Sequence, residues 1–239
     1  MAGAHPGPVS EASNVSEGSR PNDTQNIDGH GSSEIRQPTV AFWYEFASTY
    51  SYLSAMRIET LASEYGVRLI WRPFLLGPIF QKQGWTTSPF NLMPAKGRYM
   101  WRDMARQCAR YGLPLQVPDP FPQASLLAAR IAHACRDTPW IGAFTRAVFM
   151  AEFGTGRDIS DEALLADLLL EAGAPAKGIL ESAKSPGIKN ELRDTVKEAE
   201  NCGIFGAPSF RLADGDLFWG DDRLEQALET AVRIDGAPA

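Results

Sequence analysis

The order of strand-like and helix-like segments constrains the fold of this chain more than any other feature. Residues 39–46 combine aromatic and β-branched side chains in a run suited to a buried strand, and residues 67–73 alternate polar and apolar side chains up to a proline. Between them, residues 52–65 repeat apolar side chains with helical spacing and end at Gly66. Two strands joined by so short a helical crossover are expected to be parallel.

The strand pattern returns only near the end of the chain. Residues 75–90 predict a long ordered loop because they are rich in Gly, Pro and aromatic side chains, and residues 94–203 are almost entirely helical in pattern. Residues 208–219 then predict a hairpin around a two-residue Asp214-Gly215 turn, followed by a helix that begins at Asp221. The helices expected inside the long helical stretch are 95–112, 124–137, 139–153, 161–172 and 188–201, with starts at Ser160 and Ser185.

This order predicts an α/β protein with a thioredoxin-like fold that carries a large all-helical insertion. Residues 1–38 contain no Leu, Phe, Tyr or Trp, so their composition predicts a disordered N-terminal tail. We therefore divide the chain into that tail, a thioredoxin-like domain formed by residues 39–76 and 203–236, and a helical insertion domain formed by residues 77–202.

Charge and cysteine content exclude several classes of function. The chain has 23 Lys and Arg against 29 Asp and Glu, which gives no electrostatic reason to bind nucleic acid or an anionic membrane. No apolar run suits a signal peptide or a membrane span, so we expect a cytoplasmic protein. The three cysteines form neither CxxC nor a zinc-ligand spacing, and we expect reduced thiols and no metal site. His133, the single histidine after residue 38, is expected to be structural rather than catalytic.

Hydroxyl side chains occupy the turn after the first strand, residues 48–51 (Ser-Thr-Tyr-Ser). In a thioredoxin-like frame this turn lies at a helix N-terminus, where a dithiol oxidoreductase needs two cysteines, so dithiol chemistry is excluded here. Two interpretations of Ser48 remain open. Its hydroxyl could hydrogen-bond a thiolate of another molecule, or it could simply cap the helix.

Two further turns could bind a ligand. Pro208 follows a glycine-rich turn at a point where this topology typically has a cis peptide bond, which would leave the backbone of Ala207 free to pair with an extended thiol peptide. The alternative is a loop proline before an edge strand. Residues 219–223 (Trp-Gly-Asp-Asp-Arg) offer carboxylates and N–H groups to a γ-glutamyl group, or they cap the last helix.

Basic residues supply a fourth candidate. Arginines recur every four residues along one helix face, at positions 98, 102, 106 and 110. Such a stripe is usually a solvated face, and the alternative is a basic wall that attracts an anionic substrate. Arg72 and Lys96 are the best individual candidates for contacting that anion.

Four segments together resemble the 2-hydroxychromene-2-carboxylate isomerases, which are relatives of the kappa-class glutathione transferases in the DsbA-like branch of thioredoxin folds. The similarity covers about residues 40–232 and rests on the segments 46–53, 94–100, 203–210 and 218–224. The family's glutathione-activating serine corresponds to Ser48. The other residues that the resemblance implies for glutathione are Lys96, Ala207, Pro208, Trp219, Gly220, Asp221 and Asp222.

The sequence departs from the family pattern at four positions. Glu45 stands in place of Asp, Thr49 in place of Pro, and Asp221 in place of Asn or Ser. The loop of residues 84–88 lacks the family's glutathione-binding asparagine, and Thr87 is the candidate replacement.

The resemblance implies an isomerase of aromatic catabolism that uses glutathione as a cofactor. In this mechanism a glutathione thiolate, activated by Ser48, adds to a conjugated enone and is expelled after bond rotation. The substrate would be a carboxylated aromatic such as 2-hydroxychromene-2-carboxylate, bound through Arg72 and Lys96. Two alternatives stay open, a kappa-like glutathione transferase and a binding module without turnover. A homodimer is a further open possibility.

Overall fold

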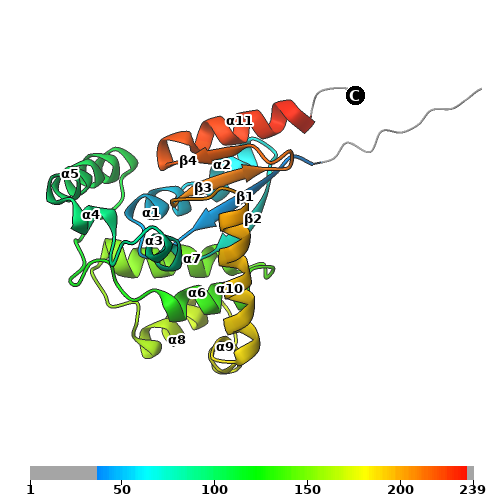
Figure 1. The fold of residues 1–239 in the computed structure, drawn as a ribbon. Coiled ribbons are helices and arrows are strands. Elements are labelled where there is room, and N and C mark those ends of the chain that lie inside the picture. The colour runs from blue at the N-terminus through cyan, green and yellow to red at the C-terminus, as the bar shows by residue number, and fades with distance from the viewer. Residues whose placement is uncertain (1–36, 236–239) are drawn as a thin grey trace, which may run out of the picture. The chain divides into compact units, whose positions relative to one another are not determined.

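A four-stranded mixed sheet lies at the centre of the computed structural model, which describes residues 37–235 (Figure 1). The strand order is β2-β1-β3-β4. β1 (Thr39–Tyr44) pairs in parallel with β2 (Arg68–Pro73) and antiparallel with β3 (Ser209–Leu212), and β3 pairs antiparallel with β4 (Leu217–Trp219). The predicted parallel pair and the thioredoxin-like fold are thus confirmed. The predicted tail, residues 1–38, falls outside the described residues except at its last two positions.

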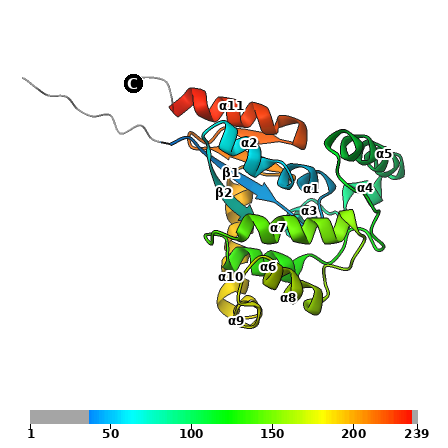
Figure 2. The same cartoon turned by 180° about the vertical axis from the view of Figure 1, so that it is seen from behind.

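Helices surround the sheet on both faces. They are α1 (Thr49–Ala55), α2 (Ile58–Glu64), α3 (Leu76–Lys82), α4 (Pro89–Leu92), α5 (Pro94–Tyr111), α6 (Leu126–Ala134), α7 (Ile141–Phe149), α8 (Glu162–Glu171), α9 (Ala176–Ala183), α10 (Pro186–Asn201) and α11 (Leu224–Asp235). Figures 1 and 2 show α11 beside the sheet, α6 to α9 on the opposite side of the fold, and α4 and α5 near the carboxyl end of β1. No helix of the described part is long and apolar enough to cross a membrane.

Successive side chains of β1 point to opposite faces of the sheet, and each face has its own hydrophobic cluster. Phe42 and Tyr44 are fully buried in a large cluster that also includes Phe144 of α7 and Leu228 of α11. Trp43 points the other way, into a smaller cluster with residues of α3 and α10. Because the larger cluster runs from the strands into α6, α7 and α8 without a break, the division into two folded domains stays a prediction.

Several predicted elements differ in the structure. Residues 52–65 form two short helices instead of one, with a break before Ile58, and the first of these already begins at Thr49. Residues 75–90 are not a loop throughout, because α3 and the start of α4 lie within them. Apolar side chains such as Ile79, which is buried against the sheet, give α3 its packing face despite the surrounding Gly and Pro.

The other differences between the predicted and the observed elements concern helix ends, one additional helix and the hairpin loop. Asp161, not Ser160, caps α8 by accepting a hydrogen bond from the N–H of Ala163, whereas Ser185 caps α10 as predicted. The predicted helix over 139–153 ends in a π-helical turn, Met150–Gly154, and α9 was not predicted. The hairpin loop holds three residues, 213–215, because Leu212 pairs with Asp216. A 3-10 turn, Asp221–Arg223, precedes α11.

Candidate active site

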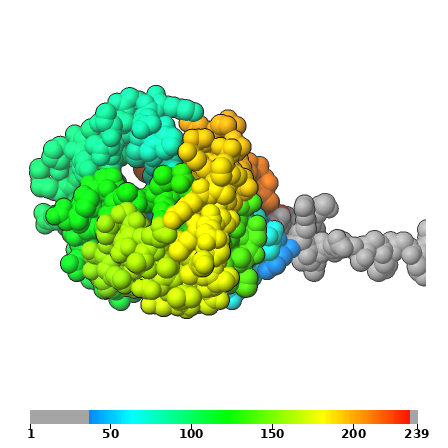
Figure 3. All heavy atoms as spheres, turned by 90° about the horizontal axis from the view of Figure 1, so that it is seen from below, coloured from blue at the N-terminus to red at the C-terminus, as the bar shows by residue number. Residues whose placement is uncertain are grey.

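The principal cavity lies at the carboxyl end of β1 and has a volume of about 1170 Å³. Segments far apart in the sequence form its walls: the β1–α1 turn, α3 and α4, one side of α5, residues 121–126, and the turns at 205–208 and 219–222. Aromatic side chains contribute much of the lining, among them Phe80, Trp85, Phe90 and Phe121. Figure 3 shows the surface hollowed between the turquoise segment that holds α3 and α4 and the green segments beside it.

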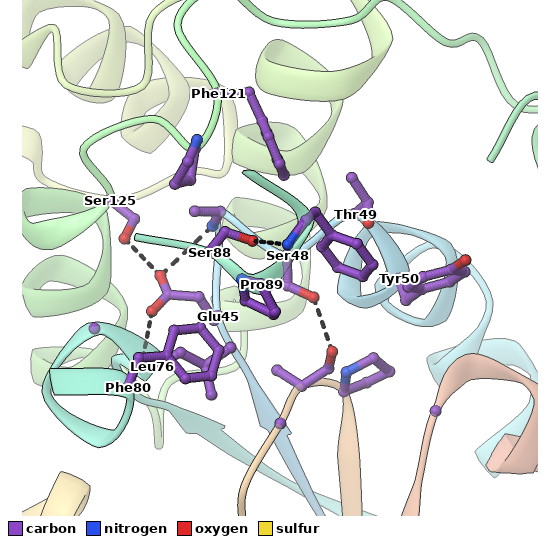
Figure 4. Close-up of a pocket in the computed structure, with 18 of the residues that line it drawn as sticks. Glu45, Ser48, Thr49, Tyr50, Leu76, Phe80, Ser88, Pro89, Phe121 and Ser125 are labelled. Atoms are coloured by element: carbon purple, nitrogen blue, oxygen red, sulfur yellow. Dashed lines mark hydrogen bonds between the residues drawn. The ribbon is translucent and has the colours of Figure 1, made fainter. Parts of the chain in front are cut away.

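Ser48 lies at the start of α1 and faces this cavity (Figure 4). Its Oγ accepts a hydrogen bond from the N–H of Ser51 at 3.3 Å, so the predicted helix cap is confirmed. The same hydroxyl donates to the carbonyl oxygen of Ala207 at 2.9 Å. The N–H groups of Thr49 and Tyr50 have no carbonyl partner among the described residues, as expected for a first helical turn. Capping and ligand contact are therefore compatible roles for this hydroxyl.

The glycine-rich turn brings Ala207 opposite Ser48. The Ala207–Pro208 peptide bond is cis, as predicted. Gly206 lies directly against the Trp219 indole, and a side chain at this position would collide with the ring. Trp219 also contacts the ring of Phe205, with 4.9 Å between centroids, and both side chains are about half exposed at the cavity rim.

The two adjacent aspartates of the 219–222 turn have opposite environments. Asp221 is only 5% exposed, and its Oδ1 accepts hydrogen bonds from Ser54 Oγ at 2.8 Å and Arg57 Nη2 at 3.0 Å. Burial raises the pKa of Asp221, and the neighbouring Arg57 opposes that rise. Asp222 has a side chain that is 78% exposed and lies 3.7 Å from Arg223. Asp221 anchors the turn and still lines the cavity, and Asp222 is exposed, so the expectation that both carboxylates face a ligand stays a prediction.

Glu45 is buried beneath the cavity and links two of its walls by hydrogen bonds. The sequence analysis did not predict this role. The side chain is 5% exposed, and its carboxylate accepts hydrogen bonds from the Leu76 N–H at 2.9 Å and from Ser125 Oγ at 2.5 Å (Figure 4). Burial raises the pKa of Glu45, while the hydrogen bond from Ser125 lowers it. An acidic residue inside an apolar strand was the available signal. Glu45 joins the end of β1 to the starts of α3 and α6, so it fixes two walls of the cavity.

Of the other three residues predicted to contact a ligand, two line the cavity and one does not. Lys96 and Thr87 both line the cavity, with Lys96 Nζ 5.5 Å from the Phe90 ring centroid and Thr87 Oγ1 accepting a hydrogen bond from Asn91. Arg72 does not line it, because its guanidinium pairs with Glu198 of α10 and stacks on Trp43 at 4.5 Å. The substrate contact expected for Arg72 is therefore corrected to a structural ion pair.

The arginine stripe and the single histidine also have defined positions. Arginines 98, 102 and 106 are exposed on α5 outside the cavity, and only Arg110 of the stripe reaches its wall. His133 is buried outside the cavity, with Nε2 3.4 Å from Glu191. Burial lowers the pKa of His133. Within residues 37–235 no group of three His, Cys, Asp or Glu side chains could hold a metal ion.

A thioredoxin sheet with a helical insertion, and a cis-proline facing the first helix, define a thioredoxin-fold protein of the DsbA type. The family model described as a DSBA-like thioredoxin domain matches residues 39–232, and the chain belongs to this family. Within it, the chain belongs to the branch of the 2-hydroxychromene-2-carboxylate isomerases and kappa-class glutathione transferases, which confirms the resemblance found in the sequence.

Three relatives illustrate this membership. The 2-hydroxychromene-2-carboxylate isomerase of Sphingobium xenophagum is 30% identical over 78% of this chain and 94% of its own length. Glutathione S-transferase kappa 1 of Homo sapiens is 28% identical over 78% of this chain and 88% of its own length. A solved 2-hydroxychromene-2-carboxylate isomerase structure has a TM-score of 0.74 at 24% identity, covering 82% and 95% of the two chains. The first two relatives are enzymes by name and support an enzymatic role for this chain, and the solved structure supports the fold.

Proposed function

We propose that this chain is a glutathione-dependent isomerase of a carboxylated aromatic compound of the 2-hydroxychromene-2-carboxylate type. The observation that carries the proposal is the position of the Ser48 hydroxyl, 2.9 Å from the Ala207 carbonyl at the floor of an aromatic cavity. The isomerase relative at 30% identity supports the choice of reaction. The cytoplasmic location expected from the sequence belongs to the same proposal.

The residues around this floor suit glutathione. Asp222 presents an accessible carboxylate to the γ-glutamyl ammonium, beside the exposed backbone turn at Trp219 and Gly220. Ala207, before Pro208, offers an N–H that has no partner among the described residues, so an extended peptide could pair with it. The list of expected glutathione contacts is completed by Thr87 and Lys96. Bound glutathione would supply a thiol nucleophile.

The chain's own residues have distinct roles in this proposal. Ser48 is expected to rotate its hydroxyl from the Ala207 carbonyl toward a sulfur, because a thiolate is the better acceptor. Lys96 is expected to hold a substrate carboxylate at the cavity wall. The aromatic side chains of the lining offer apolar surface to the aromatic body of the substrate.

The proposal is tested by titrating the chain with glutathione in a calorimeter and by following thiolate absorbance against pH in the complex. We expect binding by the wild-type chain, and a higher pKa of the bound thiol in Ser48→Ala than in the wild type. Folding stability of the variant should fall by only about 1 kcal/mol, the cost of a lost helix cap. Absence of glutathione binding by the wild type would overturn the proposal.

A kappa-like glutathione transferase is the second candidate, and it is supported by the 28% identical human relative. It would use the same residues but leave glutathione attached to the electrophile. Product analysis after incubation with 2-hydroxychromene-2-carboxylate distinguishes the two, since only the transferase consumes glutathione. Glutathione binding without turnover of either kind would instead indicate a binding module.

A further inference from the structure

A second groove lies beside the principal cavity, between α3, α6 and α10. Its volume is about 520 Å³, within the range of small-molecule sites. Three of its residues, Leu75, Pro78 and Leu126, also line the principal cavity, so the two hollows share a wall. None of the residues that the family resemblance assigns to glutathione lines this groove.

The floor of the groove is apolar. Leu192 and Val196 lie four residues apart on α10 and contribute buried side chains to it. Leu126, at the first turn of α6, is 44% exposed and forms the opposite wall. An apolar body placed here would cover the exposed side chain of Leu126, with Leu192 and Val196 already buried beneath it.

The rim of the groove is basic. Arg130 of α6 and Lys189 and Arg193 of α10 line it, and no carboxylate among the described residues lies within ion-pair distance of these three. The Nε of Arg130 is buried and has no hydrogen-bond partner in the described structure. Two other rim lysines are already paired, Lys82 with Glu200 and Lys197 with Asp194.

These three cations lie together although the net charge of the chain is −6. A ligand without a hydrogen-bond acceptor would leave the buried Nε of Arg130 without a partner, which disfavours it. An ion with several charges and no apolar part would leave the exposed side chain of Leu126 open to water. The ligand that satisfies both features carries one anionic group at the end of an apolar body.

We propose that this groove is a second binding site, which takes an amphipathic monoanion with an aromatic or aliphatic body. The anionic group lies against Arg130, Lys189 and Arg193, and the apolar body lies on Leu192 and Val196. Because the groove shares a wall with the principal cavity, its ligand and the contents of that cavity contact the same side chains.

The test compares an anionic and an uncharged fluorescent probe of similar shape, 8-anilino-1-naphthalenesulfonate and N-phenyl-1-naphthylamine. Lys189→Glu/Arg193→Glu reverses two exposed charges that lie four residues apart at the groove. The matched control, Arg98→Glu/Arg102→Glu, reverses two exposed charges of the same spacing on α5, outside both hollows. Thermal melts establish that both variants fold.

We expect the groove variant to weaken binding of the sulfonate by about fivefold or more, and the control to change it by less than about twofold. Binding of the uncharged probe should be the same in both variants. Arg130→Gln should also weaken binding of the sulfonate probe. Equal weakening by the groove variant and the control would overturn the proposal, because it would show that Lys189 and Arg193 do not hold the sulfonate.

Discussion

At the scale of single residues, neighbouring side chains of one type serve different purposes in this chain. Asp221 is buried against Arg57, whereas Asp222 points outward beside the cavity. Helical and turn geometry aims successive side chains in different directions, so a sequence pair of aspartates need not form one site. Of the two carboxylates, that of Asp222 is the more exposed to solvent.

We predict that Asp222→Ala weakens glutathione binding by about three- to tenfold, because an exposed ion pair contributes on the order of 1 kcal/mol. Calorimetry measures the change. Asp137→Ala is the matched control, since Asp137 is 85% exposed and lies 3.6 Å from a sequence-adjacent arginine, as Asp222 does at 3.7 Å. Equal affinities of Asp222→Ala and the control would remove Asp222 from the site.

Glu152 is a second informative residue. It is fully buried in the π-helical turn, and neither carboxylate oxygen has a hydrogen-bond partner in the described structure. Burial raises the pKa of Glu152 well above its usual value, and the carboxylates of Glu45 and Asp158 raise it further. The folded state therefore keeps a proton that the unfolded chain loses above pH ~4.3, so stability falls as pH rises beyond that value.

Glu152→Gln should remove this loss, because the amide is neutral at every pH. We expect the Tm of the variant to exceed that of the wild type at pH 8 by roughly 2–4 °C, for a gain of about 1 kcal/mol, with little difference at pH 5. Thermal melts at the two pH values measure it. Glu181→Gln, at an exposed position on α9, should leave the pH dependence unchanged. If Glu152→Gln has a lower Tm than the wild type at pH 8, the prediction is wrong, because Glu152 would then be ionised and stabilised by its surroundings in the folded state.

At the scale of elements, Arg57 joins segments that the sequence separates widely. It lies between α1 and α2, bonds Asp221 at 3.0 Å and Glu225 at 2.7 Å, and stacks 4.0 Å from the Tyr111 ring centroid at the end of α5. The break between α1 and α2 falls at this residue. Arg57 thus holds the 219–222 turn in place without lining the cavity itself.

Arg57→Gln should destabilise the fold by about 3 kcal/mol, since it leaves a buried carboxylate unpaired. The cost should be larger at pH 8 than at pH 5, because Asp221 without Arg57 can avoid the penalty only by taking up a proton. Denaturant unfolding at both pH values measures it. Adding Asp221→Asn to Arg57→Gln should recover part of the loss at pH 8. If the losses in unfolding free energy of the two single variants add up to the loss of the double variant, the two side chains are not coupled.

At the scale of the whole molecule, the composition of residues 1–36 predicts that they add little to folding stability, since they contain no Leu, Phe, Tyr or Trp. Deleting them should change the Tm by no more than about 1–2 °C. A deletion that extends through Val40, which is fully buried in β1, should lower the Tm strongly. Comparison of the two truncations by thermal melting tests this, and an equal drop in both would contradict it.

Local sequence patterns determined much of this fold. The parallel β1–β2 pair, the Ser48 cap and the cis-proline of the 203–208 turn were each predictable. The first follows from the order strand, helix, strand, the second from the residue before a helix, and the third from the place of the proline in the topology. The hydroxyls of residues 48–51 likewise excluded dithiol chemistry without any knowledge of tertiary contacts.

Tertiary structure alone decided which of these residues meet. Arg72 could not be excluded from the cavity until its partner Glu198 on α10, 126 residues later, was located. Side chains from distant segments likewise determine the hydrogen bonds of Glu45, the burial of Asp221 against Arg57, and the basic groove along α10. A sequence pattern gives the direction of a side chain relative to its own helix or strand, whereas its partner and its burial are set by how the elements pack against one another.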